Sequence, residues 1–331
     1  MIKIDVEAID KTSIKVEWSG IEPGRQVFVF LGTSQSTIDR KNPVAVSTSG
    51  HTRITGLDPL NRYYFEISVD GKAGVIAAPR RVIMDGAVNF RDLGGYATKD
   101  GRQVKWGRVF RADGLARLSD VDLKRMVRMK ITRVFDLRSA AEMADAPDRL
   151  PDNRSIKHVH VPVTHGDFDF VEAMKRIKAG DTSWLTDDFM VKGYINNIES
   201  FPLAWGRIIG EAADAGKGPL VFHCTGGKDR TGTCAALLLL ALGVDEETVI
   251  YDHQLSNIYI RQLLPQIYEM MASYGIDPEI LFPYLTAPRE CVEALLEHIR
   301  KNYGSATGYL VERGGMIPEE IERIKQGLLE K

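Results

Sequence analysis

The chain has 331 residues, a formal net charge of −2, 44% hydrophobic residues and 27% charged residues, which fits one large globular domain or two ordinary ones. The near-neutral charge gives no global electrostatic reason to expect nucleic acid or a membrane surface as a partner. Three cysteines cannot form a disulfide framework, and neither a signal peptide nor an apolar run long enough to span a bilayer is visible. We therefore expect a cytoplasmic protein, or a secreted one if a leader has been removed.

The first 80 residues show the pattern of an all-β sandwich. Turn-forming Gly, Pro, Asn and Asp separate short runs that alternate apolar and polar residues, namely Ile14–Trp18, Gln26–Phe30 and Tyr63–Val69. The segment Leu57–Tyr63 resembles the tyrosine corner of fibronectin type III domains, and Trp18 stands where such domains place a core tryptophan. We expect residues 1–80 to form a small fibronectin type III-like domain with a junction near Pro79–Arg81. This domain would pack on the rest of the chain or contact a partner.

From about residue 85, predicted strands alternate with predicted helices. Ile131–Leu137 and Lys157–Val163 are expected to be buried strands, and Asp245 is placed to cap a helix that runs through Ile250. Further helices are expected within residues 254–302 and 318–330. This alternation predicts an α/β domain over residues 81–331, with a central sheet flanked by helices.

One ten-residue stretch, His223–Gly232, carries the strongest functional signal. It contains a cysteine, five residues and then an arginine, between the apolar run Leu220–Phe222 and the Ala/Leu-rich run Cys234–Leu242. A strand, a glycine-rich loop and a buried helix are predicted, and such a loop with the positive end of its helix forms an anion site. Cys224 would lie at the floor of this site, where the same field stabilises a thiolate, and Arg230 would direct two N–H bonds onto phosphate oxygens. The remaining phosphate-binding residues are expected to be Thr225, Gly226, Gly227 and Lys228.

Two other interpretations of this stretch are weaker. A nucleotide-binding P-loop requires G-x-x-x-x-G-K-[ST], but Phe222 stands at the first glycine position and Asp229 at the hydroxyl position. A buried structural cysteine would explain most chance matches to C-x5-R. Here the flanking strand, the paired glycines and the Arg-Thr-Gly step agree on a catalytic loop. The stretch therefore favours covalent phosphoryl transfer through Cys224.

Four motifs in order make the chain similar to the bacterial, LipA-like and MptpB-like tyrosine phosphatase family. They are Asn89–Tyr96 (NFRDLGGY), Arg111–Leu115 (RADGL), Asp136–Ser139 (DLRS) with Glu142, and His223–Gly232 (HCTGGKDRTG). The resemblance spans about residues 85–260 and implies a cysteine-dependent phosphatase, without metal or cofactor, that acts on phosphotyrosine. Two features depart from the family pattern. Gly226 replaces the usual alanine, which loosens the loop without removing activity, and the N-terminal β module is an addition.

The resemblance also implies roles for single residues. Cys224 would attack phosphorus and form a cysteinyl-phosphate that water then hydrolyses, while Arg230 clamps the equatorial oxygens. Thr231 is placed to hydrogen-bond the departing thiolate. His223 is expected to orient the loop rather than to transfer protons.

The general acid is less sharply defined. The resemblance implies Asp229, inside the loop itself. Asp136 is the alternative, because it ends a predicted strand at the edge where α/β sites form, although a brace for the loop or for Arg230 explains it equally well. Asp167 and Asp169 lie on a connecting segment and also offer carboxylates, but such residues are more often simply solvated.

Lys228 bears on the choice of substrate. Phosphotyrosine needs one phosphate site, whereas a polyphosphorylated inositol headgroup benefits from an additional cation in the loop. Phosphoinositides are therefore a second expected substrate class. The alternative roles for Lys228 are stabilisation of the thiolate or an ion pair with a carboxylate.

His158, His160 and His165 have a spacing compatible with zinc, but a polar strand end is the simpler explanation, and no metal or cofactor is expected. Aromatic residues that could form a helical lid, as in the family, or a core are Tyr251, Tyr259, Tyr268, Tyr274 and Phe282.

The main alternative function is a phosphate-binding pseudophosphatase that acts as an interaction module. Arsenate reduction, which needs further resolving thiols, is a weaker alternative.

Overall fold

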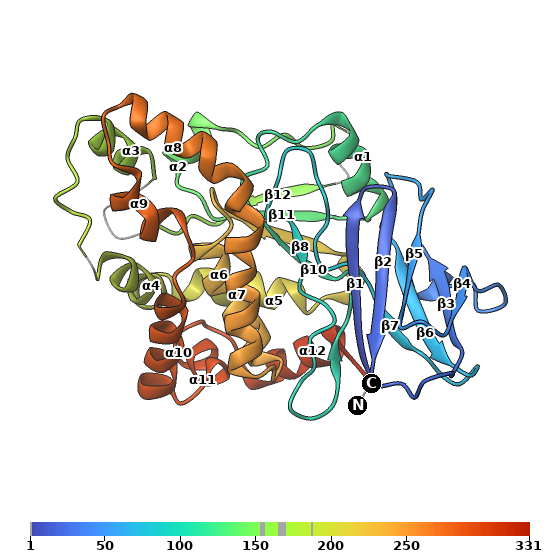
Figure 1. Ribbon diagram of the computed structural model, residues 1–331. Helices are drawn as coiled ribbons and strands as arrows, with labels where there is room; N and C mark the ends of the chain where they lie inside the picture. Colours follow the sequence, from blue (N-terminus) through green and yellow to red (C-terminus); the bar gives the residue numbers. More distant parts are fainter. Residues whose placement is uncertain (1, 153–155, 165–169, 187) are drawn as a thin grey trace.

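An all-β part formed by the N-terminal residues stands beside a larger α/β part (Figure 1). The computed structural model describes residues 2–152, 156–164, 170–186 and 188–331. The all-β part has two antiparallel sheets with strand orders β1-β2-β5 and β4-β3-β6-β7. Its elements are β1 (Lys3–Asp10), β2 (Ser13–Ser19), β3 (Val27–Gly32), η1 (Gln35–Thr37), β4 (Ala45–Ser47), β5 (His51–Ile54), β6 (Tyr64–Val69) and β7 (Val75–Ala77).

Alternating side chains explain why these two sheets pack face to face. Along β2, Val16 and Trp18 are buried while Lys15 and Glu17 are half-exposed, and both apolar residues join Phe65 of β6 in one apolar cluster. The three expected strands are confirmed as β2, β3 and β6. At the corner before β6, the phenolic oxygen of Tyr63 accepts a hydrogen bond from the N–H of Asp58 at 2.9 Å, a contact of the kind that closes a tyrosine corner.

A buried ion pair joins the all-β part to the α/β part. Nη2 of Arg62 lies 2.7 Å from Oδ2 of Asp92, and both side chains are buried. Tyr64 and Trp106, one from each part, share a small apolar cluster beside this pair. Because breaking a buried ion pair is strongly destabilising, this contact favours one fixed arrangement of the two parts. The division at residue 80 stays a prediction.

The α/β part is built on a five-stranded sheet with the order β12-β11-β13-β10-β8. Neighbouring strands pair in parallel except for β8, which lies antiparallel to β10 at one edge. The strands are β8 (Arg91–Asp92), β10 (Val109–Ala112), β11 (Arg133–Asp136), β12 (Lys157–His160) and β13 (Leu220–His223), while β9 (Gln103–Val104) pairs separately with β14 (Leu329–Glu330). The expected α/β fold with a central sheet is confirmed.

Helices cover both faces of this sheet. Phe222 of the central strand β13 belongs to a large apolar cluster that includes residues of α4, α5, α6 and α10, whereas its neighbour Val221 belongs to a second cluster shared with α1. The helices are α1 (Asp120–Arg128), α2 (Ala140–Asp145), α3 (Phe170–Lys178), α4 (Phe189–Ser200), α5 (Pro202–Ala212), η2 (Ala215–Lys217), α6 (Asp229–Ala241), α7 (Glu246–Ile260), η3 (Arg261–Leu263), α8 (Leu264–Ser273), α9 (Pro278–Leu285), α10 (Arg289–Tyr303), α11 (Ala306–Glu312) and α12 (Pro318–Leu328).

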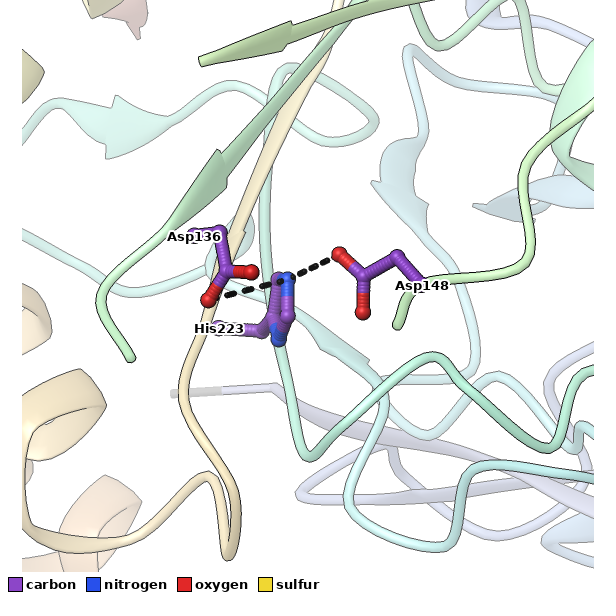
Figure 2. Close-up of side chains that lie close together, drawn as sticks. All are labelled: Asp136, Asp148 and His223. Atoms are coloured by element: carbon purple, nitrogen blue, oxygen red, sulfur yellow. Dashed lines mark hydrogen bonds and ion pairs between the residues drawn. The ribbon is translucent and has the colours of Figure 1, made fainter. Parts of the chain in front are cut away.

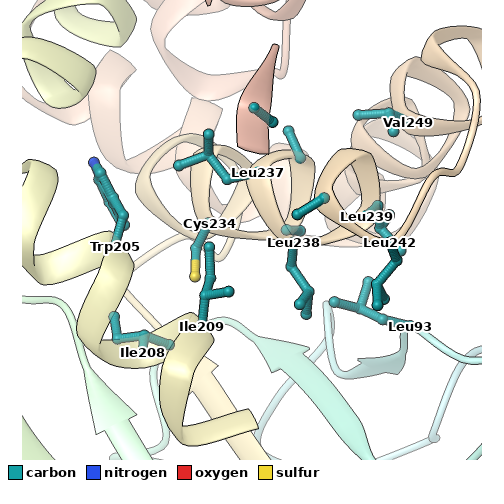
Figure 3. Close-up of a cluster of buried hydrophobic side chains, with 14 of the residues drawn as sticks. Leu93, Trp205, Ile208, Ile209, Cys234, Leu237, Leu238, Leu239, Leu242 and Val249 are labelled. Carbon is teal, nitrogen blue, oxygen red and sulfur yellow. The ribbon is translucent and has the colours of Figure 1, made fainter. Parts of the chain in front are cut away.

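Helix α6 lies at the centre of the large cluster. Figure 3 shows Leu237, Leu238 and Leu239 of α6 between side chains of α5, such as Trp205, and Val249 of α7. A helix that is apolar on all sides is a core helix. Since α6 begins directly after the glycine-rich loop, this packing fixes the position of the helix end that faces the site.

Several element boundaries differ from expectation, and the strand expected over Ile131–Leu137 spans Arg133–Asp136. The strand expected to run to Val163 ends at His160, although the N–H groups of Val161 and Val163 still donate to the carbonyls of Asp136 and Leu137 at 2.9 and 3.0 Å. Pro162 is tolerated between them because β12 lies at the edge of the sheet. The helix expected to reach residue 330 ends at Leu328, and the last strand pairs with β9. The cap at Asp245 is confirmed, since its side chain accepts from the N–H of Thr248 at 2.9 Å. In the described parts of the chain, no helix combines the length and the apolar character needed to cross a membrane.

Candidate active site

The glycine-rich loop connects β13 to α6 at the carboxyl edge of the parallel strands. Cys224 follows the last residue of β13, and Asp229 is the first residue of α6. The expected strand, loop and buried helix are therefore confirmed. Cys224 is buried, its Sγ accepts a hydrogen bond from Oγ1 of Thr231 at 3.1 Å, and it lines a cavity of about 310 Å³. A sulfur at the bottom of a cavity, beside a helix N-terminus, is placed to attack a bound anion.

Glu142 holds Arg230 from behind with a bidentate ion pair. The two N···O distances are both 2.7 Å, and Oε1 of Glu142 also accepts from Oγ1 of Thr225 at 2.6 Å. Burial alone would raise the pKa of Glu142, but Arg230 holds it at about 2, and the pair raises the pKa of Arg230 above its usual value despite burial. Glu142 thus orients both the Arg230 guanidinium and the start of the loop. The sequence placed Glu142 in a motif but did not indicate this role.

Two buried side chains tie the loop carbonyls away from the cavity. Nδ2 of Asn89 donates to the carbonyls of Gly226 and Gly227 at 3.2 and 3.0 Å, and Nη2 of Arg111 donates to Gly227 at 2.8 Å. A planar trans peptide directs its N–H opposite to its C=O. Tying back the carbonyls therefore turns the loop N–H groups toward the side from which an anion would approach.

Gly227 and Gly226 have different reasons to be glycine. Gly227 has φ of +66°, and a Cβ there would lie 2.5 Å from the carbonyl oxygen of Ala112 and from the N–H nitrogen of Asp113. Only glycine fits both constraints. A Cβ at Gly226 would meet only the Lys228 side chain, at 3.6 Å or more. The alanine that is usual in the family would therefore fit here as well.

Lys228 and Asp229 form an ion pair in the cavity wall. Nζ of Lys228 lies 2.8 Å from Oδ2 of Asp229 and 3.0 Å from Oδ1, and both residues line the cavity. The Lys228 ammonium also lies 5.7 Å from the ring centroid of Tyr284 on α9. Of the alternatives for Lys228, the ion pair with a carboxylate is the one that the structure contains.

Asp136 and His223 belong to a polar cluster behind the loop (Figure 2). Nε2 of His223 lies 2.8 Å from Oδ2 of Asp148 and 3.8 Å from Oδ1 of Asp136. Arg138 donates to both carboxylates, in each case at 2.7 Å from Nη2. Burial would raise the pKa of Asp136, but hydrogen bonds from His158 and Arg138 hold it far below its usual value. A carboxylate held ionised in this way suits the role of a brace better than that of a proton donor.

The same cluster has the geometry but not the chemistry of a metal site. Ligand atoms of Asp136, Asp148 and His223 lie within 4.8 Å of one another, but the Arg138 guanidinium already provides the positive charge that a metal would supply to the carboxylates. His158 contacts the same carboxylates, which raise its pKa to about 9, so that its ring is protonated at neutral pH. A protonated imidazole cannot bind a metal. His160 is held by a 2.8 Å contact between Nε2 and the carbonyl of Arg138.

Asp113 is a cavity-lining carboxylate that the sequence placed in a motif without a role. It is buried, and burial raises its pKa, while its two oxygens accept from the backbone N–H groups of Val88 and Asn89 at 3.0 and 2.9 Å. Among the described residues that line the cavity are thus Asp113 and Asp229, but not Asp136. The other carboxylates considered, Asp167 and Asp169, lie outside the described residues, as does His165.

The roof of the cavity, defined as its lining from the end of α7 through η3, α8 and α9, is mostly aliphatic. Ile267, Met271 and Leu281 are examples, and Ile177 of α3 packs against the last two. The aromatic residues considered for a lid or a core do not form this lining: among the roof residues described, the aromatic one is Tyr284. Three of the expected residues are largely exposed on the outer surface, namely Tyr251, Tyr274 and Phe282.

Known proteins resemble this chain over most of its length. Residues 82–330 match the model of a family described as the tyrosine phosphatase family. A Cupriavidus necator protein provisionally named a tyrosine-protein phosphatase is 33% identical over 225 residues, which cover 67% of this chain and 80% of that protein. The triple specificity protein phosphatase PtpB of Mycobacterium tuberculosis is 31% identical over 278 residues, which cover 74% of this chain and 98% of that protein. Among solved structures, TpbA of P. aeruginosa aligns with a TM-score of 0.26 and 13% identity, over 51% of this chain and 90% of its own.

Proposed function

The chain belongs to the tyrosine phosphatase family, and from this premise we propose that it hydrolyses phosphotyrosine through a cysteinyl-phosphate intermediate. The observation that carries the proposal is the placement of Cys224 Sγ at the cavity floor, hydrogen-bonded by Thr231 and beside the Arg230 clamp that Glu142 orients. Preorganised positive groups at the point where charge develops are the largest single contribution to this kind of catalysis.

In the first step, Cys224 Sγ bonds to phosphorus while the bond from phosphorus to the ester oxygen breaks. The departing oxygen keeps the electron pair and takes a proton from Asp229. Arg230 and the loop N–H groups hold the equatorial oxygens, where electrostatic stabilisation does most of the work. In the second step, water attacks phosphorus and returns a proton to Asp229. The sulfur leaves as a thiolate, which Thr231 stabilises, and inorganic phosphate is released.

Replacing the nucleophile tests this scheme directly. Cys224→Ser should abolish release of phosphate from an aryl phosphate while retaining vanadate or phosphate binding, because the loop and clamp remain. The assay is run in EDTA, since no step requires a metal. Appreciable turnover by Cys224→Ser would identify another nucleophile and overturn the proposal.

Asp229 is the proposed general acid because it lines the cavity beside the nucleophile. Asp229→Asn should slow aryl phosphates with poor leaving groups far more than those with good ones, because only poor leaving groups need a proton. Equal losses for both classes would remove Asp229 from the role. Asp113 is then the next carboxylate to test, because it also lines the cavity, unlike Asp136.

Phosphoinositides are the second proposed substrate class. Lys228 lies in the cavity wall, and a second phosphate would attract its ammonium away from Asp229. One relative carries the name triple specificity protein phosphatase, which is consistent with a broad substrate range. A panel of phosphopeptides, phosphoinositides and soluble inositol phosphates tests this, with Lys228→Met expected to lose the polyphosphorylated substrates selectively. Uniform losses across the panel would assign Lys228 to the first phosphate alone.

A phosphate-binding pseudophosphatase remains the alternative function. It predicts phosphate binding without turnover of any aryl phosphate, and the complete set of Cys224, Arg230 and Asp229 argues against it. Arsenate reduction is disfavoured further, because it needs a thiol that can reach Cys224. Cys234 is completely buried in α6, and burial raises its pKa well above the usual value and that of Cys291 to about 12.

The N-terminal module is proposed to be fibronectin type III-like and to brace the catalytic part rather than to recruit a partner. Its two-sheet strand order and the Tyr63 corner support the first point, and the buried pair of Arg62 with Asp92 supports the second. We expect one cooperative unfolding transition for the whole chain. Two separate transitions would show that the module is independent.

A further inference from the structure

The Asp229 carboxylate has a buried partner that the reaction scheme above does not use. Tyr194 on α4 is completely buried, and its hydroxyl donates to Oδ1 of Asp229 at 2.9 Å. Nε2 of His253 on α7 lies 2.7 Å from the hydroxyl oxygen of Tyr194, on the side away from Asp229. Side chains from three different helices therefore form a line that ends at a carboxylate in the cavity wall.

The protons along this line have one consistent arrangement. An ionised carboxylate can only accept, so the Tyr194 hydroxyl donates to Asp229 and must itself accept from N–H at Nε2 of His253. This tautomer leaves Nδ1 of His253 as an acceptor, and Nε2 of Gln254, a donor, lies 3.3 Å from it. Burial, together with the nearby Arg111, lowers the pKa of His253 to about 3, so the ring is neutral. Burial also raises the pKa of Tyr194 well above its usual value, so the hydroxyl keeps its proton.

Gly232 explains how the His253 ring comes this close to α6. A Cβ at Gly232 would lie 2.9 Å from Cδ2 of His253, which is closer than real Cβ contacts. The glycine of the Arg-Thr-Gly step therefore leaves the space that the imidazole needs. This second observation connects the loop motif itself to the line of side chains.

The ion pair with Lys228 cannot hold Asp229 throughout the reaction. A bound phosphate would attract the Lys228 ammonium, which now contacts both Asp229 oxygens. The Tyr194 side chain is completely buried on α4 and its hydroxyl carries no charge, so its bond to Oδ1 persists when Lys228 moves. Tyr194 can therefore fix the carboxyl group while Oδ2 exchanges the proton.

We propose that Tyr194 and His253 are positioning residues that orient Asp229 for proton transfer to the leaving group and from water. The inference rests on the proposed role of Asp229 as general acid and base. His253 acts through Tyr194, because it fixes the direction in which the tyrosine hydroxyl points, and Gly232 gives it room to do so.

The test compares Tyr194→Phe with a matched control, Tyr309→Phe. Tyr309 is also completely buried, and its hydroxyl donates to the carbonyl of Ile198 on the same helix α4 at 2.6 Å, but it has no bond to Asp229. Tyr194→Phe should lower kcat for phenyl phosphate about tenfold, with KM unchanged, and kcat for dinitrophenyl phosphate less than about twofold. Tyr309→Phe should leave kcat for both substrates unchanged. Both variants lose a buried hydroxyl and should unfold at a lower temperature.

Two further variants separate positioning from general damage. His253→Gln keeps an N–H donor near the position of Nε2 and should retain most of the phenyl phosphate rate, whereas His253→Leu should reproduce Tyr194→Phe. In an Asp229→Asn background, Tyr194→Phe should have less than about a twofold additional effect, because coupled residues are not additive.

Three results would overturn the inference. They are equal losses for both substrates in Tyr194→Phe, a full tenfold loss in the Asp229→Asn background, and no difference between His253→Gln and His253→Leu. If Asp229 is not the general acid at all, the result is different: Asp229→Asn alone would then lose the same factor in rate for good and for poor leaving groups.

Discussion

Polar contacts hold the floor of the cavity, whereas apolar contacts hold its roof. The floor, from Cys224 to Arg230, is fixed by buried polar side chains such as Glu142, Asn89 and Arg111. The roof is held by aliphatic packing around Leu281, and its outer surface is partly exposed. A satisfied buried polar network specifies one geometry, whereas apolar contacts tolerate rearrangement. Under the proposed mechanism, the fixed floor would carry the reaction, while the roof would shape the space above it.

The largest effect on the floor is expected from removing Glu142, which holds Arg230 in place. Glu142→Ala leaves the buried Arg230 without its bidentate partner and frees Thr225, so kcat/KM for an aryl phosphate should fall about 10³-fold. Asp145→Ala, an exposed carboxylate on the same helix α2, is the matched control and should stay near the parent rate. A loss of less than about tenfold for Glu142→Ala would show that Arg230 needs no orientation from behind.

The backbone of the floor offers the next largest effect. Gly227→Ala introduces a Cβ 2.5 Å from the end of β10 at a residue with positive φ, so the loop must shift and kcat/KM should fall about 10²-fold. Gly226→Ala is its neighbour and control, and should keep activity within about twofold, because the new Cβ makes ordinary contacts. Similar losses in the two variants would contradict this account of the loop. Steady-state kinetics on one aryl phosphate decides between them.

A third prediction concerns the free energy of unfolding of the chain as the pH changes. The unfolded chain protonates His253 below about pH 6.5, but the folded chain does so only near pH 3. The contribution of the neutral His253 ring to the free energy of unfolding is therefore complete above pH 6.5. It decreases as the pH falls, by about 2 kcal/mol between pH 7.5 and 5. Denaturant unfolding of the parent and of His253→Gln at several pH values should show this change as the difference between the two free energies of unfolding. The carboxylate of Glu142, with its pKa at about 2, loses its contribution only below about pH 4.5. His158, whose pKa is raised to about 9, gains stability as the pH falls through the same window and opposes the His253 slope, so the comparison with His253→Gln is what isolates His253.

The sequence predicted the floor better than the roof, for a physical reason. Cys224, the glycines and Arg230 lie within seven residues, so local strand, turn and helix signals were enough to predict their arrangement. Glu142 and Asn89 contact the loop from 88 and 138 residues away, and only their motifs, not their roles, were visible. Tyr194 has no local motif and becomes identifiable only when α4 packs against α6. For the aromatic residues the sequence left a lid or a core open, and the roof is formed by aliphatic side chains whose pattern is that of an ordinary core.

The smallest effect on turnover is expected from the roof. Leu281 is completely buried and lines the cavity from α9, and Leu281→Ala would leave space between α3, α8 and α9 that these helices can partly close. A small aryl phosphate makes its decisive contacts with the loop, so its kcat/KM should change by less than about threefold. A naphthyl phosphate, which reaches farther into the cavity, should show the larger rise in KM. A loss of kcat comparable to that of Glu142→Ala would mean that the roof transmits its packing to Arg230 and Cys224, and the distinction between a polar floor that reacts and an apolar roof that selects would no longer hold.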